Sequence, residues 1–476
     1  MNIANRWWVD VWSRPGRAVV RMWRRFTPVQ TFVASFASLI LLGTLGLRLL
    51  PGLYVGERLG WVDALFTSTS AVCVTGLIVV DTATYFTRAG QAFLLLLIQL
   101  GGLGMLAFTT MIILSLGRRL SLRQEALAAS LLEIAPHIDS RRLTRHVLRF
   151  TLLLEAAGAV VLFTVFAPRF GLVDGAWHAI FQAISAFCNA GFSTFTDSLA
   201  GFQRSPISLA VVMALIVLGG LGFLTIEELY LQHRARGHGE RPERLSLHSR
   251  LVLVLTALLL LGPWALFSMF EWGATFAELP VWAKLLNGLF ASVTARTAGF
   301  NTIDYAATTD STNFLTIILM FIGGSPGSTA GGIKTTTVGL IGLLAWSRLR
   351  GRQIASIGGR SIREETLQRA VGLTAIAFVL ITAAIMVYVT LEFSGTTRAA
   401  PGSSFLAYMF EATSAFNTVG LSMGVTDDLS TGARWLTIVL MYVGRVGPLA
   451  VAASLVLPEA AAPRRLRYSY EDVVVG

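Results

Sequence analysis

Stretches of apolar residues long enough to cross a lipid bilayer recur along the whole chain. Eight of them follow one another, at about residues 30–50, 91–116, 150–167, 206–230, 251–270, 313–345, 370–393 and 434–457. A membrane-spanning helix needs about 20 predominantly apolar residues. Hydrophobic residues make up 54% of the 476 residues and charged residues only 14%, so a globular core could not hide the apolar surface. The sequence therefore predicts an all-α polytopic membrane protein and excludes an ordinary soluble one.

Arginine is concentrated in alternate connections between these stretches. It gathers before the first, between the second and third, fourth and fifth, and sixth and seventh, and after the eighth, whereas the remaining connections hold acids such as Asp81, Asp197 and Asp304. Cytoplasmic loops of membrane proteins carry the excess of Lys and Arg. We therefore expect a multi-pass protein of the plasma (inner) membrane with both termini in the cytoplasm. This topology explains the formal net charge of +11, and no nucleic-acid partner is expected.

Residues 1–28 interleave arginine with four tryptophans, Trp7, Trp8, Trp12 and Trp23. Such a segment can lie along the inner leaflet, with its rings at headgroup depth and its guanidinium groups on anionic membrane lipid. A helix that docks on a partner protein is the rival interpretation, and the residues do not choose between the two.

Four shorter apolar segments, each of about a dozen residues, alternate with the long stretches. They are Trp61 to Cys73, Trp177 to Cys188, Val281 to Ala295 and Ser403 to Phe416. Each is too short to cross the bilayer and is predicted to be a re-entrant half-helix surrounded by protein, because irregular backbone at membrane depth must be buried or face water. A similar phrase follows each segment: Val74-Thr75-Gly76-Leu77, Asn189-Ala190-Gly191-Phe192, Thr297-Ala298-Gly299-Phe300 and Thr418-Val419-Gly420-Leu421.

The pattern of span, half-helix, glycine phrase and span occurs four times in the same orientation. It predicts eight transmembrane helices and four re-entrant half-helices around one pore, with a pseudo-fourfold axis along the membrane normal. The expected organisation is a cytoplasmic amphipathic N-terminal segment at 1–28, pore repeats at 29–117, 118–233, 234–346 and 347–458, and a cytoplasmic C-terminal tail at 459–476.

The four glycine phrases are predicted to form the walls of a cation filter. An ion at membrane depth needs oxygens that replace its water, and rings of backbone carbonyls supply them without a fixed charge that would trap the ion. Glycine adopts the unusual dihedrals that turn successive carbonyls inward. Half-helices whose partially negative C-terminal ends point at the pore favour a cation over an anion. The first candidates are Gly76, Gly191, Gly299 and Gly420.

The four walls differ in sequence. The residue two positions before the glycine is Val74, Asn189, Thr297 or Thr418. A ring of unequal walls should be less selective than one made of four identical loops. Cys73 and Cys188 stand at the same position of the first two walls and are interpreted as small packing residues, with no support for a disulfide or a metal site. Arg296 is expected to be held by carbonyls or an acid behind the third wall, away from the ion.

The sixth long stretch is interrupted by five glycines and a proline. Its residues 323–335 read Gly323-Gly324-Ser325-Pro326-Gly327-Ser328-Thr329-Ala330-Gly331-Gly332-Ile333-Lys334-Thr335. This composition cannot remain a regular helix. A mobile intramembrane loop below the filter is predicted in preference to an ordinary kink, which needs only one or two such residues.

Arg445 takes the place of a glycine that the other three repeats have at Gly102, Gly220 and Gly324. A charge at the bilayer centre costs about 2.5–3.5 kcal/mol on insertion scales, so the side chain should face the pore or hold a polar partner. Loop carbonyls, or a hydroxyl such as that of Ser328, are the expected partners. The hypothesis is that Arg445 and the loop close the pore from the inside. Whether Lys334 shares this role or extends to the cytoplasmic interface stays open.

The repeated plan resembles the Trk/Ktr/HKT superfamily of potassium transporters over nearly the whole chain. Within it, the phrase TSAVCVTGLIVVDT at 69–82, the eight predicted spans and the ending YEDVVVG at 470–476 look most like the Ktr membrane (pore) subunit. The resemblance implies uptake of K+ bound by the filter carbonyls, often dependent on Na+, with a gating loop at 323–335. It also implies a homodimer with one pore per subunit and a cytoplasmic ring of RCK-type nucleotide-binding regulatory subunits. No cofactor is expected in this chain itself.

Three alternatives to potassium uptake are considered. The nearest is a sodium or poorly selective Na+/K+ transporter of the same superfamily, in which a serine at the first filter glycine goes with sodium transport; this chain has Gly76. A proton-coupled solute transporter would need a membrane relay of carboxylates, and Glu155, Glu392 and Glu411 are too scattered to form one. A membrane enzyme would need a cluster of histidines and acids at membrane depth, whereas five of the six histidines lie in predicted cytoplasmic loops.

Overall fold

The computed structural model describes residues 28–116, 140–237, 245–352, 356–357, 360–393 and 405–455. The tryptophan-rich N-terminal segment and the C-terminal tail lie outside these residues, so their predicted roles stay predictions. The described part is almost entirely helical, with one small antiparallel hairpin of β1 (Ser356–Ile357) and β2 (Arg360–Ser361).

Four helices in the described part are long and apolar enough to cross a membrane. They are α2 (Pro28–Leu49), α7 (Ser140–Phe170), α11 (Leu247–Glu271) and α15 (Glu364–Phe393), and they overlap the first long stretch predicted for each repeat. Large apolar side chains on them are well exposed, including Leu41, Leu153, Leu258 and Phe378. Extended apolar surface of this kind needs lipid or protein to cover it.

Four short helices occupy the segments predicted to be half-helices. They are α3 (Trp61–Val72), α8 (Leu172–Cys188), α12 (Val281–Thr294) and α16 (Phe405–Phe416). Their C-terminal halves lie inside the protein: every residue of α16 from Phe410 onward is buried, and nearly all the corresponding residues of α3, α8 and α12 are buried too. Helix α8 begins at Leu172, earlier than expected, with Asp174 in its first turn, where an acid favours a helix start. The short helices α4 (Thr82–Tyr85) and η1 (Ala200–Phe202) lie in the polar connections that follow α3 and α8.

The second long stretch of each repeat is less regular than the sequence predicts. Helix α5 (Arg88–Leu116) is continuous, but the others are the broken pairs α9 (Pro206–Gly220) and α10 (Phe223–Gly237), α13 (Asp310–Phe321) and α14 (Thr335–Leu349), and α17 (Thr431–Val446) and α18 (Pro448–Leu455). The sequence predicts the second of these breaks only. The expectation of unbroken spans at 206–230 and 434–457 is wrong, because Gly222 (φ +84°) and Gly447 (φ +96°) take the left-handed conformation that ends a helix.

Glycines allow the second helix of three repeats to pack directly on the C-terminal end of the short helix. A Cβ added at Gly101, Gly219 or Gly444 would lie 2.0, 2.0 or 1.6 Å, respectively, from the carbonyl oxygen of Val72, Phe187 or Phe416. No side chain fits at such distances, so these positions must be glycine for the backbones to approach this closely. The C-terminal ends of α3, α8 and α16 are thereby held in fixed positions.

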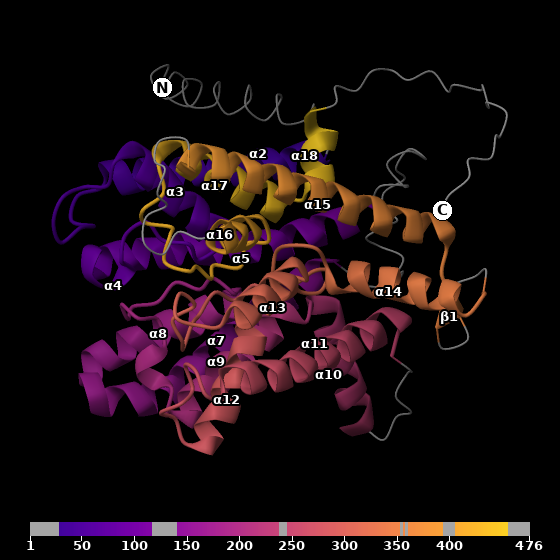
Figure 1. The fold of residues 1–476 in the computed structure, drawn as a ribbon, viewed down its shortest axis with the longest axis horizontal. Coiled ribbons are helices and arrows are strands. Elements are labelled where there is room, and N and C mark those ends of the chain that lie inside the picture. The colour runs from indigo at the N-terminus through magenta and orange to yellow at the C-terminus, as the bar shows by residue number, and fades with distance from the viewer. Residues whose placement is uncertain are drawn as a thin grey trace, which may run out of the picture.

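The first and last parts of the chain lie side by side (Figure 1). Helix α2 packs against α18, and α3 packs against α17. An ion pair between Arg434 of α17 and Asp63 of α3, with 2.6 Å between guanidinium nitrogen and carboxylate oxygen, joins the same elements. The elements from α7 to α12 form the other half of the structure (Figure 1).

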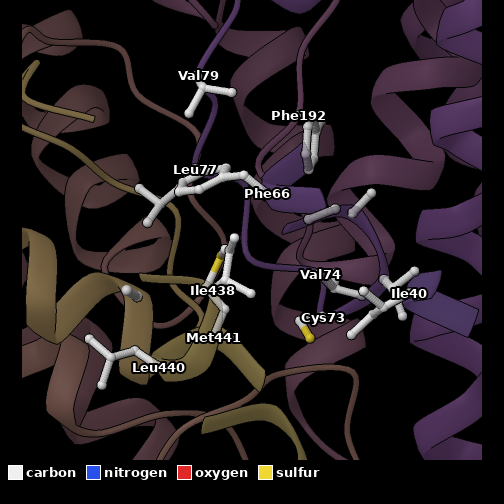
Figure 2. Packing of buried hydrophobic residues seen from close by; sticks show 14 of the residues in the cluster. Ile40, Phe66, Cys73, Val74, Leu77, Val79, Phe192, Ile438, Leu440 and Met441 are labelled. Atoms are coloured by element: carbon white, nitrogen blue, oxygen red, sulfur yellow. The ribbon is translucent and has the colours of Figure 1, made fainter. Parts of the chain in front are cut away.

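The largest hydrophobic cluster surrounds the residues that follow α3. It combines side chains of α2, α3 and α5 with those of α15, α16 and α17. Figure 2 shows part of it, with Cys73, Val74 and Leu77 from the first glycine phrase together with Ile438 and Met441 of α17. Chain ends that are remote in sequence therefore share one core around this phrase.

Candidate cation filter and gate

The four glycine phrases share one unusual backbone conformation. The left-handed residues of the phrases are Val74, Asn189, Thr297 and Thr418, with φ of 55°, 59°, 67° and 50°, and Gly76, Gly191, Gly299 and Gly420, with φ of 96°, 71°, 79° and 92°. Positive φ is uncommon outside glycine and a genuine outlier for β-branched residues. Because positive φ occurs at the same two positions in all four phrases, the same backbone conformation is imposed on all four walls.

The four glycines form a closed ring. A Cβ added at each glycine would collide with the next wall: Gly76 with Ala190 O at 2.5 Å, Gly191 with Gly299 Cα at 2.9 Å, Gly299 with Val419 O at 2.6 Å, and Gly420 with Thr75 O at 2.1 Å. The order of contact is first, second, third, fourth and back to first. The backbone carbonyls beside these glycines are therefore gathered around one point, which glycine alone permits.

Hydroxyl groups near the ends of the short helices are hydrogen-bonded to the backbone of the glycine phrases. Ser70 donates to Leu77 O at 2.7 Å and Ser185 donates to Phe192 O at 2.7 Å. In the fourth wall, Gly420 N donates to the Ser414 hydroxyl at 3.1 Å. These serines are absent from the predicted site, although each stands six residues before a filter glycine, a spacing that could have revealed them.

The third wall is one residue shorter than the others. Its hydroxyl comes from Thr294, five residues before Gly299, and donates to Phe300 O at 2.5 Å. The backbone agrees, since Ala298 N bonds to Thr294 O four residues back, whereas Thr75 N bonds to Ser70 O five residues back. The inequality of the walls therefore extends beyond side-chain identity to the length of the turn.

Several polar groups at the ring lack partners within the described residues. The hydroxyl oxygens of Thr75, Thr297 and Thr418 are buried and accept or donate no hydrogen bond there. Arg296 is largely buried too, and its Nε is buried without a hydrogen-bond partner within the described chain. Unpaired buried polar groups are rare enough in proteins for each to need an explanation.

The segment predicted as a gating loop lies between α13 and α14 and closes on itself. Gly323 N donates to Ile333 O at 2.8 Å, and Thr335 N donates to Gly324 O at 3.0 Å. The Lys334 ammonium donates to Ala330 O at 2.7 Å inside the loop. Lys334 therefore acts as an internal tie of the loop in this structure.

The loop is docked on the break between α9 and α10. Thr329 N donates to Gly219 O at 3.1 Å, and Ser325 N donates to Gly220 O at 3.0 Å. The Thr329 hydroxyl contacts Gly219 O at 3.0 Å and Phe187 O at 3.1 Å, at the end of α8. The last carbonyls of a helix have no intrahelical hydrogen-bond donors, and here N–H and O–H groups of the loop donate to them.

The other side of the loop touches the fourth wall. A Cβ added at Gly331 would lie 1.9 Å from the Thr418 hydroxyl, and one added at Gly332 would lie 2.9 Å from the Asn417 amide oxygen. In the second wall, the Asn189 side chain is 3.1 Å from the Thr329 hydroxyl. The loop is therefore in direct contact with the second and fourth walls.

Arg445 of α17 reaches the middle of the loop. Its side chain is 3% exposed and one guanidinium nitrogen donates to Thr329 O at 2.5 Å. The partner is thus a loop carbonyl, as expected, while the Ser328 hydroxyl is buried without a partner among the described residues. Arg445 also lies near enough to Lys334 for electrostatic repulsion, so a basic side chain of α17 and one of the loop itself come together here.

The two cysteines are free and buried, 0% and 1% exposed. The Cys188 thiol donates to Gln99 Oε1 at 3.4 Å, and the Gln99 amide nitrogen donates to both Glu155 oxygens at 3.1 Å. Both thiols lie close to Arg445. Within the described residues, no group of three or more His, Cys, Asp or Glu is placed to hold a metal ion.

The model of the TrkH family, described as a cation transport protein, matches residues 20–464 of the chain. This protein belongs to the TrkH family. It is thus an integral membrane protein of a cation-transporting family, in agreement with the resemblance seen in the sequence. The crystal structure of the potassium transporter TrkH from Vibrio parahaemolyticus matches with a TM-score of 0.71 over 91% of this chain and 86% of that one, at 19% identity, which shows a shared fold.

Several curated relatives cover nearly the full chain. The potassium/sodium uptake protein NtpJ of Enterococcus hirae is 38% identical over 96% of this chain and 99% of its own length. The Ktr system potassium uptake protein B of Vibrio alginolyticus is 36% identical over 87% of this chain and 88% of its own, and that of Bacillus subtilis is 35% identical over 95% and 98%. The similarity thus includes the predicted Ktr group within the family.

Proposed function

We propose that this TrkH-family protein takes up K+ across the plasma membrane through the ring formed by its four glycine phrases. Four span, half-helix and span repeats would surround this single pore about a pseudo-fourfold axis. The observation that carries the proposal is the contact of Gly76, Gly191, Gly299 and Gly420 in sequential order. The names of the Ktr and NtpJ relatives support potassium as the transported ion.

The chemistry of the ring suits a monovalent cation. Carbonyls gathered around one point replace the hydration shell of an ion. The C-terminal ends of α3, α8, α12 and α16 lie next to the phrases, and their partial negative charge favours a cation there. The unpaired hydroxyls of Thr75, Thr297 and Thr418 support a partner from outside the chain, such as the ion or its water.

The loop at 323–335 would be the gate below this filter. It is held by Thr329 and Ser325 against the break after α9 and by Arg445 from α17. Two nearby cationic groups, Arg445 and Lys334, would raise the electrostatic energy of a cation at this level. Displacement of the loop would both open the path and move these charges.

The regulatory partner in this proposal is a cytoplasmic ring of RCK-type nucleotide-binding subunits, acting on a homodimer of the pore chain. The relatives named as parts of a Ktr system support an assembly with other subunits. The positive connections of the sequence support a cytoplasmic location for both termini and for the face that would meet the ring.

The test is growth at low potassium of a cell that lacks its own potassium uptake, with a Ktr-type regulatory subunit supplied. The parent chain should rescue growth, and Gly76→Ser should lose the preference for K+ over Na+. A Cβ at Gly76 would lie 2.5 Å from Ala190 O, so the serine must displace the neighbouring wall. Absence of rescue by the well-expressed parent with its partner would refute the proposal.

The second candidate is a transporter of both Na+ and K+. The unequal walls favour it, since the third turn is one residue shorter, and so does the name of NtpJ, a potassium/sodium uptake protein. Equal rates of Na+ and K+ uptake by the parent would select this candidate. A requirement for Na+ without its net accumulation would instead identify Na+ as a coupling ion or an activator.

A further inference from the structure

Two short helices carry a buried polar residue at the same place. Gln182 in α8 and Glu411 in α16 each stand nine residues before a filter glycine, and both side chains are 0% exposed. Buried amides and carboxyls are expensive unless they are hydrogen-bonded. The hydrogen-bond partners of Gln182 and Glu411 therefore show which part of the structure each side chain fixes.

Both residues hold the outer part of their own wall. The Gln182 amide nitrogen donates to the Ser193 hydroxyl at 2.6 Å. The Glu411 carboxylate accepts from the Thr426 hydroxyl, which lies 2.9 Å from the Ser422 hydroxyl. Each serine directly follows the last residue of a glycine phrase, so the polar residue of the helix is connected to the exit of the filter.

The two serines also form the same local turn. Ser193 accepts from Phe195 N at 3.0 Å, and Ser422 accepts from Gly424 N at 3.0 Å, in both cases from the backbone two residues further on. The helix residue thus fixes a serine that in turn fixes the start of the outer connection. Two walls share this device in spite of their different sequences.

The walls in question are opposite each other in the ring. The order of contact places the second wall between the first and third, so the second and fourth face across the centre. The equivalent place in the other two walls is three residues before the hydroxyl residue at the helix end. Thr67, whose hydroxyl is buried without a partner in the described chain, and Ala291 stand there. The bracing is therefore confined to one diagonal of the ring.

We propose that Gln182 and Glu411 are a matched pair of positioning residues that fix the width of the filter along this diagonal and thereby set its discrimination between K+ and Na+. The inference rests on the proposed potassium filter. In the snug-fit account of selectivity, a carbonyl ring rejects the smaller ion because it does not contract around it, and bracing two facing walls resists that contraction.

Glu411 contributes a hydrogen-bond acceptor for the Thr426 hydroxyl rather than a charge. Its hydrogen-bond partner in the described chain is a hydroxyl, and no Lys or Arg there forms an ion pair with it. Its second oxygen has no partner, and neither has the amide oxygen of Gln182. An amide in place of the acid should therefore preserve the brace.

The test measures K+ and Na+ uptake separately in liposomes that hold the purified full-length chain. Glu411→Ala and Gln182→Ala should each lower the K+/Na+ ratio by about fivefold or more, and Glu411→Gln should stay within about twofold of the parent. Thr67→Ala is the matched control, since it truncates the equivalent helix residue of a wall without a brace, and its ratio should not change. Ser422→Ala and Ser193→Ala remove the braced hydroxyls and serve if an alanine variant in a helix does not fold.

The outcomes separate this inference from the proposed function. A parent that prefers K+ while the brace variants keep its ratio would overturn the inference alone. A fall in Glu411→Gln as large as in Glu411→Ala would also overturn it, because charge would then be the contribution. A parent that shows no preference for K+ would overturn both.

Discussion

Backbone strain is concentrated in the residues that stand two positions before the glycines of the four phrases. Val74, Thr297 and Thr418 are β-branched and yet adopt positive φ. Each such residue costs about 1–3 kcal/mol and persists only where its surroundings over-determine it. Here a backbone bond from Val74 N to Ala71 O and the contact of neighbouring walls provide that constraint. The direction of the carbonyls is thus maintained against local preference.

At the residue scale, Gly420→Ala should abolish K+ transport, whereas Gly52→Ala should not. Both glycines have positive φ, 92° and 76°, so both variants lose about 1–2 kcal/mol from the left-handed conformation. Only at Gly420 does the new Cβ meet another wall, 2.1 Å from Thr75 O, while Gly52 has open space. K+ flux into liposomes, with thermal unfolding of each variant, separates the two effects. Equal flux in both variants would contradict the ring.

Identical sequence does not give identical structure in the second helices. Gly101-Gly102-Leu103-Gly104 lies within continuous α5, whereas Gly219-Gly220-Leu221-Gly222 ends α9 in a left-handed turn. The difference lies in the partner, because the loop of the third repeat donates to the carbonyls of Gly219 and Gly220. Local sequence predicts where a helix can break, and tertiary contacts decide whether it does.

At the element scale, Thr329→Val should release the loop and raise the rate of transport in the absence of the regulator. Valine keeps the shape of threonine and the backbone bonds but loses the hydroxyl contacts to Phe187 O and Gly219 O. Gly219 O keeps its bond from Thr329 N, whereas Phe187 O loses its donor from the loop, and a hydrogen bond lost in this way costs about 1–3 kcal/mol. Arg445→Ala, which removes the donor to Thr329 O, should act in the same direction.

Ser328→Ala is the control for the loop, because this hydroxyl is equally buried but has no partner in the described chain. Its transport should match the parent in single-channel or flux recordings made without and with the regulatory subunit. Regulation that is unchanged in both Thr329→Val and Arg445→Ala would show that the loop is not the gate.

For the molecule as a whole, recurrence in the sequence is enough to predict the four short helices, and the glycine and proline content of residues 323–335 predicts the loop between α13 and α14. Composition and spacing carry that information because each repeat must satisfy the same requirement in the membrane. Composition and spacing do not predict contacts between repeats, such as the ion pair of Arg434 with Asp63. They also do not predict the hydrogen bonds that connect Ser422 to Glu411 through Thr426. The shorter turn at Thr294 was missed for a different reason, since its register is fixed by backbone bonds.

The orientation of the whole molecule gives the last prediction. Gly56, in the connection after α2, and Gly237, at the end of α10, are exposed, and an added Cβ at either would meet nothing within 4 Å. Cysteine should therefore be tolerated at both, while the native Cys73 and Cys188 are buried and should give little background. A membrane-impermeant maleimide should label Gly56→Cys in intact cells and Gly237→Cys only after permeabilisation, because arginines surround the second site.

Detergent-solubilised protein provides the control, since both variants should then label fully and the parent should stay unlabelled. The orientation decides on which side of the filter the gate lies, because the loop at 323–335 leads through α14 into the arginine-containing connection that begins near Arg350. If Gly237→Cys were labelled from outside, the loop and Arg445 would face the exterior. A cytoplasmic regulator could not then act on them directly, and the proposed regulation would have to be abandoned while the filter ring itself remained.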